Sequence, residues 1–159
     1  MNKNIKSAVL SDCGAYRYIL TRGECLNPLV FIMLNPSTAD HLEDDPTIRR
    51  CIGFAEGNGF DGIVVLNLYA LRSTKPENLW KSDSPVGDLN DFYIKSVKSN
   101  EVVCAWGRNA KKDRVDHVLA ILKESNISAC CLGANKDNSP KHPLYLSKKS
   151  KIIKWEQDQ

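Results

Sequence analysis

Four runs of apolar residues recur along the chain without the strict alternation expected of a sheet that has one solvated face. They are PLVFIML (28–34), GIVVLNLYA (62–70), EVVCAW (101–106) and ISACCL (127–132). Such runs are typical of parallel strands that are covered on both faces. We therefore predict four parallel core strands.

The segments between these runs show helical patterns. Asp45 precedes Pro46, which is a favourable order for the start of a helix, and the GNG triplet at 57–59 marks its end. Two further helices are predicted after Asp88 and after Asn109, each of which is placed to cap a helix. The residues expected to face the core are Ile48, Cys51, Ile52 and Ala55 in the first helix, Leu89, Phe92, Tyr93 and Val97 in the second, and Val115, Val118, Leu119 and Leu122 in the third.

Residues 7–23 are predicted to form a β-hairpin. Two short strand-like stretches, SAVLS and YRYIL, flank the sequence DCG, in which Asp12 and Gly14 provide turn chemistry. We expect this hairpin to form an antiparallel edge or a flap.

The order of strands and helices predicts an α/β fold. Residues 1–159 contain no internal repeat, low-complexity tract or linker, so we expect a single three-layer domain with a central four-stranded parallel sheet and the N-terminal hairpin. Its 42% hydrophobic and 26% charged residues are ordinary for a globular protein.

Composition narrows the function only slightly. No apolar run approaches the roughly 18 residues of a membrane span, and the polar N-terminus lacks the hydrophobic stretch of a signal peptide. We therefore expect a soluble, cytoplasmic protein without a membrane partner. The net charge of +3 is compatible with a polyanionic partner but is too small to imply one, because solvated surface lysines are the commoner explanation. The six cysteines form no C-x-x-C pair and the three histidines are scattered, so we expect neither a metal nor another cofactor.

Polar clusters follow all four apolar runs. They are NPSTAD (35–40), NLYALRST (67–74), WGRNAKKD (106–113) and GANKDNSPKHPLYLS (133–147). Because open α/β sheets bind ligands at the carboxyl ends of their strands, we expect the clusters to converge on one cleft. Each cluster taken alone is also compatible with ordinary turns and helix caps.

Individual residues in these clusters indicate chemistry. Asn67 lies within an apolar strand, where its amide is either satisfied in the core or reads the edge of a nucleobase. Arg108, Lys111 and Lys112 surround a predicted helix start, which favours a bound phosphate unless the side chains extend into water. His142 precedes Pro143, and an imidazole held in this way either is structural or donates to a developing oxyanion.

The segments NPST, VVLNLYALR, AWGRNAKK and HPLYLS resemble, in order and spacing, the motifs of the uracil-DNA glycosylase superfamily. The chain more closely resembles a bacterial and phage domain-of-unknown-function family, number 1643, through NPSTAD followed by DPTIRR, over about residues 8–147. The glycosylase resemblance is confined to the strand ends.

The glycosylase resemblance implies roles for several residues. Asn35 would position a water molecule, Asn67 would read the base, His142 would stabilise the departing base and Leu146 would wedge into the base stack. An asparagine is no general base. The acids Asp40, Glu43, Asp44 and Asp45 are foreign to the glycosylase loop, and they either supply a base, with Asp40 as the candidate, or bind the sugar, or are solvated loop acids of which one caps a helix. The remaining residues assigned to substrate binding are Pro36, Ser37, Thr38, Arg72, Trp106, Gly107, Arg108 and Lys111.

These observations predict a domain that binds a nucleobase, nucleotide or DNA and hydrolyses an N-glycosidic bond. Two alternatives remain: another base- or nucleotide-modifying enzyme that uses the acids of residues 40–45, and a non-catalytic nucleotide or nucleic-acid sensor. Carboxylates that face Asn35 and His142 across the cleft favour an enzyme. DNA or a nucleotide is the expected partner, and no obligate protein partner is inferred.

Overall fold

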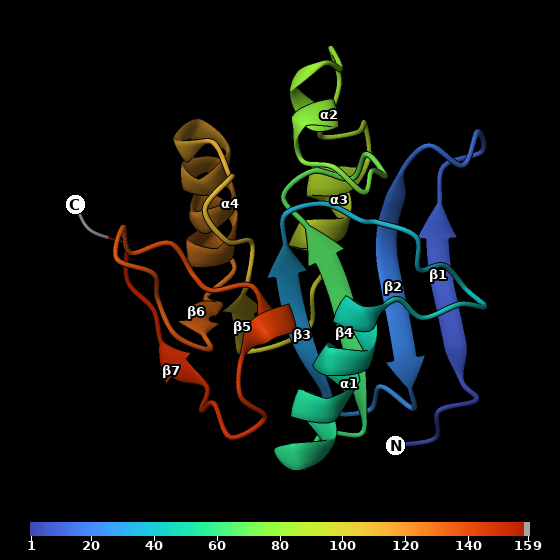
Figure 1. The fold of residues 1–159 in the computed structure, drawn as a ribbon, viewed down its shortest axis with the longest axis vertical. Helices are drawn as coiled ribbons and strands as arrows, with labels where there is room; N and C mark the ends of the chain where they lie inside the picture. Colours follow the sequence, from blue (N-terminus) through green and yellow to red (C-terminus); the bar gives the residue numbers. More distant parts are fainter. Residues whose placement is uncertain (158–159) are drawn as a thin grey trace.

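The computed structural model describes residues 1–157 and contains a seven-stranded mixed sheet flanked by helices (Figure 1). The strand order is β1-β2-β4-β3-β5-β6-β7. The strands are β1 (Lys6–Leu10), β2 (Arg17–Gly23), β3 (Pro28–Met33), β4 (Gly62–Asn67), β5 (Glu101–Cys104), β6 (Ser128–Cys131) and β7 (Ile153–Lys154). The predicted α/β class is confirmed.

The sheet is larger than predicted. β3 pairs in parallel with β4 and with β5, and β5 pairs in parallel with β6. The predicted hairpin is present as the antiparallel pair β1–β2, and β2 continues the sheet by pairing antiparallel with β4. At the other edge β7 pairs antiparallel with β6. Sequence patterns did not predict β7, because two residues are too few to show a period.

Helices cover both faces of the sheet (Figure 1). They are α1 (Pro46–Gly57), α2 (Glu77–Trp80), α3 (Asn90–Lys95), α4 (Lys112–Glu124) and the 3₁₀ turn η1 (Pro143–Tyr145). One hydrophobic cluster joins α1 to the strands, and a second cluster joins α2, α3 and α4 to the opposite face. No helix within residues 1–157 is long and apolar enough to cross a membrane.

Helix α1 forms as predicted, whereas α3 and α4 begin differently. The Asp45 side chain accepts a hydrogen bond from Ile48 N at 2.8 Å and so caps α1. Helix α3 begins after Leu89 without a side-chain cap, so the prediction of an Asp88 cap is wrong. Helix α4 begins after Lys111, also without a side-chain cap, and Asn109 has no capping role.

The predicted inward face of α3 also needs correction. Leu89 and Phe92 are 50% and 65% exposed, while Asn90 and Ile94 are buried. The reason is a tertiary contact, since Nδ2 of Asn90 donates to the carbonyl oxygens of Asn67 and Leu68 at 2.9 and 3.1 Å. Phe92 is thus exposed, whereas Tyr93 and Val97 pack against the core as predicted.

Candidate active site

A polar pocket of about 230 Å³ lies where the carboxyl end of β3 meets the amino end of α1. Five segments far apart in sequence meet there. They contribute Arg17 from β2, Met33, Leu34, Asn35 and Ser37 from the end of β3, Asp45, Thr47 and Ile48 from the start of α1, Ser73, Thr74 and Pro76 from the loop after β4, and His142. The predicted convergence therefore brings together parts of three of the four polar clusters.

The amide of Asn35 is oriented by backbone carbonyls. Its Nδ2 donates to Ser73 O at 2.9 Å and to Pro36 O at 3.0 Å, with a longer contact to Leu71 O at 3.4 Å. Because the amide nitrogen is used in this way, the oxygen Oδ1 is the acceptor that Asn35 offers to a ligand. Such an oxygen can hold a water molecule but cannot take its proton.

His142 is fixed as a hydrogen-bond donor. Its Nδ1 accepts a hydrogen bond from Leu144 N at 3.3 Å, so the neutral ring carries its proton on Nε2. Burial lowers the pKa of His142, and the negative charge of Asp45 opposes this shift. Arg50 of α1 donates to Leu144 O at 3.3 and 3.4 Å and thereby ties this loop to the helix. His142 therefore lines the pocket as a neutral N–H donor.

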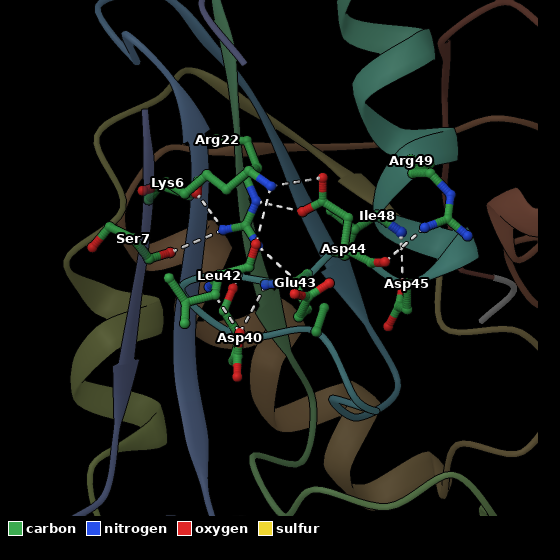
Figure 2. A network of polar contacts seen from close by, with 12 residues as sticks. Lys6, Ser7, Arg22, Asp40, Leu42, Glu43, Asp44, Asp45, Ile48 and Arg49 are labelled. Atoms are coloured by element: carbon green, nitrogen blue, oxygen red, sulfur yellow. Dashed lines mark hydrogen bonds and ion pairs between the residues drawn. The ribbon is translucent and has the colours of Figure 1, made fainter. Parts of the chain in front are cut away.

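The acids of residues 40–45 have separate tasks (Figure 2). Asp40 closes a turn, since its Oδ1 accepts from Leu42 N and Glu43 N at 2.8 and 2.9 Å. Asp44 accepts from Nε of Arg22 at 2.6 Å and lies 3.5 Å from Nζ of Lys6. Of the four acids, Asp45 is the one that lines the pocket. The pocket carboxylate is therefore Asp45, and the structure places the predicted catalytic residue Asp40 outside the lining.

Asp45 lines the same pocket as Asn35 and His142. Its Oδ1 caps α1, which leaves Oδ2 for a ligand or water. The charge of Asp45 raises the pKa values of both Arg17 and His142 against the effect of their burial. One carboxylate thus acts electrostatically on both of the basic groups in the pocket.

Arg17 was not predicted as a site residue. The register of β1 with β2 shifts between Val9↔Ile19 and Leu10↔Arg17, so β2 carries one extra residue there. Such a bulge places Arg17 on the same face as Leu20, toward α1, where regular alternation would point it away. An arginine in a strand usually indicates an exposed position, and no local sequence signal reveals the bulge.

Asn67 is not part of the pocket lining, although Met33, the residue opposite it on β3, is. It is 1% exposed, and neither polar atom of its amide has a hydrogen-bond partner within residues 1–157. In the parallel register Asn67 is opposite Met33, and both follow the alternation that puts Val65 and Phe31 against α1. A buried amide without partners is costly, so Asn67 differs from a satisfied core amide.

Other predicted substrate-binding residues of the first two clusters are dispersed. Ser37 lines the pocket, Pro36 is buried and Thr38 is exposed. The Arg72 side chain donates to Gly14 O at 3.3 Å and is not part of the lining. It is nevertheless close enough to lower the pKa values of both Arg17 and Asp40 by its charge.

The third cluster lines two other pockets. Trp106, Gly107 and Arg108 line a pocket of about 290 Å³, and Lys111 lines one of about 430 Å³. Nζ of Lys111 lies 4.5 Å from the centre of the Trp80 ring, which is a cation–π contact. A Cβ atom on Gly107 would lie 3.9 Å from Cβ of His142, so this loop borders the histidine without sharing its pocket.

Leu146 is partly buried and packs against the cluster that contains α1, while Tyr145 beside it is 89% exposed. The predicted wedge residue is therefore a packing residue in this conformation. Within the described part of the chain, no group of three or more His, Cys, Asp or Glu side chains is arranged to hold a metal ion.

The fold and site define an α/β protein with a polar pocket beside the carboxyl end of a parallel strand. The chain belongs to the family described as "Protein of unknown function (DUF1643)", whose model matches residues 17–144. No curated protein and no solved structure gave a significant match.

Proposed function

We propose that this protein hydrolyses the N-glycosidic bond of a nucleotide or of DNA, with the base held in the Asn35–Asp45–His142 pocket. The observation that carries the proposal is the meeting of three groups in one small pocket: the Asp45 carboxylate, the Asn35 amide oxygen and the Nε2–H of His142. Capping of α1 uses Oδ1 of Asp45, so Oδ2 remains to act on a substrate.

The reaction needs both a negatively charged group and a hydrogen-bond donor, and the pocket contains both. As the C1′–N bond breaks, positive charge develops on the sugar and negative charge on the base. The Asp45 carboxylate stabilises the positive charge on the sugar and takes a proton from a water molecule. Oδ1 of Asn35 holds this water molecule in position. His142 Nε2–H donates to the oxygen or nitrogen of the base on which negative charge collects.

Pocket size and fold add support. A volume of about 230 Å³ is small for a drug-sized ligand and matches a single base or sugar ring. The parallel order β4-β3-β5-β6, with the polar clusters after these strands, agrees with a uracil-DNA-glycosylase-like arrangement, which we include in the proposal. In that arrangement Asp45 of α1 supplies the carboxylate that the Asn35 loop lacks.

The test is a screen for release of free base from oligonucleotides and nucleotides that carry normal and modified bases. The decisive variant is Asp45→Asn, because asparagine caps a helix as well as aspartate does but takes no proton from water. Asp40→Asn is the matched control, since an asparagine oxygen still accepts from Leu42 N and Glu43 N.

We expect Asp45→Asn to lower the rate of base release about a hundredfold or more, and Asp40→Asn to leave it unchanged. Equal rates of base release by wild type and Asp45→Asn would show that the Asp45 carboxylate is not catalytic. Absence of base release from every substrate would refute the proposed reaction.

A further inference from the structure

Two arginines are buried on the same face of β2 but are satisfied very differently. Arg22, which is 1% exposed, donates five hydrogen bonds, including the one to Asp44 Oδ1. The side chain of Arg17, which is 2% exposed, donates one hydrogen bond within the described residues, from Nη1 to Ala39 O at 2.6 Å. Its Nε is buried without any partner there. Arg22 is therefore the structural arginine of the pair. The burial of Arg17 with so few hydrogen bonds needs another explanation.

Arg17 and Asn67 lie on the neighbouring strands β2 and β4, and both carry buried polar atoms without a partner among the described residues. Arg17 lines the pocket directly, and its backbone N donates to Ala70 O at 2.9 Å, just past the end of β4. Asn67 ends β4 on the neighbouring strand, with its side chain on the same face. Because Arg17 is an incompletely bonded buried cation that lines a pocket, it indicates a ligand that completes its hydrogen bonds.

We propose that Arg17 is a catalytic residue that contacts an oxygen acceptor of the bound nucleobase and stabilises the negative charge of the base as it departs. This inference rests on the proposed function and extends it by naming the substrate class, a base that leaves as an anion, and the cation that receives it.

The oxygen of water forms a bond to C1′ while the C1′–N bond breaks, and the bonding electron pair goes to the base. Asp45 accepts one proton of the water and returns it through solvent to the base anion, so the products are the free base and the 1-hydroxy sugar and Asp45 is again a carboxylate. Arg17 stays protonated throughout, because burial lowers its pKa only to about 10. Its charge acts strongly because little water surrounds it.

Thermal unfolding separates a ligand-binding arginine from a structural one without any assumption about the reaction. Arg22→Met removes the partner of Asp44, and we expect the melting temperature to fall by roughly 10 °C. Arg17→Met replaces a poorly bonded buried charge with an apolar side chain of similar length, and we expect an unchanged or higher melting temperature. A loss in Arg17→Met as large as that in Arg22→Met would make Arg17 structural and overturn the proposal.

Binding of free bases tests the contact itself. The probes are two pairs, uracil with 5-fluorouracil and hypoxanthine with xanthine, in which the second member is the more acidic. At pH 8 we expect the more acidic member of at least one pair to raise the melting temperature of wild type more than its partner does, and we expect Arg17→Met to lose this difference. No shift with either pair, or the same shifts in Arg17→Met, would contradict the contact.

Catalysis provides the third readout, on whichever nucleotide wild type hydrolyses. We expect Arg17→Met to slow release of a weakly acidic base about a hundredfold, release of its more acidic analogue much less, and Arg17→Lys to recover part of the rate. Base release that Asp45→Asn abolishes but Arg17→Met leaves unchanged would refute the role of Arg17 and spare the proposed function. Should wild type release no base, the proposed function fails, while the stability and binding results still decide whether Arg17 contacts a base.

Discussion

Nε of the buried Arg22 lies 2.6 Å from Oδ1 of Asp44, the residue immediately before the pocket carboxylate Asp45 (Figure 2). This pair attaches the loop before α1 to strand β2. Because the same guanidinium also donates to the backbone oxygens of Asp40 and Glu43, Arg22 fixes the loop that sets the position of Asp45. Asp44 thus supports the pocket without lining it.

The first prediction concerns this pair. Asp44→Ala leaves the Arg22 charge buried without its carboxylate, and we expect the free energy of unfolding to fall by about 3 kcal/mol, measured by urea denaturation. The control is Asp116→Ala, which removes the exposed Lys112–Asp116 pair, where solvent screens the attraction. A loss in Asp44→Ala no larger than that in the control would show that Arg22 does not depend on Asp44.

The second prediction concerns the pH dependence of stability. Burial lowers the pKa of folded His142 below its ordinary value of 6.5, so the unfolded chain binds a proton more readily than the folded one. The stability that this histidine provides above pH 6.5 is therefore lost as the pH falls through the lowered pKa. We expect the unfolding free energy to fall less steeply between pH 6.5 and pH 5 in His142→Gln than in wild type. Parallel pH profiles would contradict a lowered pKa.

The tautomer of His142 is a separate prediction. Since Nδ1 accepts from Leu144 N, nitrogen-15 NMR of the imidazole at pH 7.5 is expected to show the proton on Nε2. A proton on Nδ1 would leave no donor directed at the ligand and would remove the proposed role of this residue. His117, whose Nε2 lies 2.8 Å from Asp91 Oδ2, provides an internal comparison in the same spectrum.

The fourth prediction concerns two glycines. Gly107 has φ +74°, a conformation in which a Cβ atom is strained, so we expect Gly107→Ala to lower the unfolding free energy by about 1 kcal/mol. Gly53 lies within α1 with nothing within 4 Å of an added Cβ, and we expect Gly53→Ala to raise it by roughly 0.5–1 kcal/mol. Equal effects of the two substitutions, measured by urea denaturation, would contradict this assignment of backbone strain.

The fifth prediction concerns the start of α4. If DNA contacts this helix, Lys111→Glu weakens binding of a single-stranded oligonucleotide and reduces the salt dependence of its affinity by about one phosphate contact. Lys123→Glu, with the same charge change at the other end of α4, is expected to retain the wild-type salt slope. An unchanged slope in Lys111→Glu would exclude Lys111 from the binding surface.

The sequence predicts the elements whose signals are local. The apolar runs locate strands β3 to β6, and the Asp45–Pro46 pair locates the start of α1. The inward positions of Leu89 and Phe92 were predicted wrongly because six residues are too few for a helical period and because Asn90 bonds to the end of β4. A local sequence pattern does not predict which face of a short helix is buried when a tertiary contact sets the orientation of that helix.

The candidate site follows the same division. The polar clusters correctly point to the strand ends, yet they do not reveal which acid faces the pocket, because that depends on Arg22 binding Asp44. Arg17 was missed because a one-residue bulge, set by pairing with β1, turns it inward. The choice of the pocket acid and the inward position of Arg17 both depend on strand β2, which lies outside the polar clusters.

The most direct test of the central claim is mass spectrometry of the reaction products formed in ¹⁸O-labelled water. With the substrate identified by the base-release screen, hydrolysis of the N-glycosidic bond places one ¹⁸O atom on the sugar at C1′ and none on the free base. We expect this labelling with wild type and about a hundredfold slower product formation with Asp45→Asn. Label on the base, or products that form equally fast without the Asp45 carboxylate, would contradict the account.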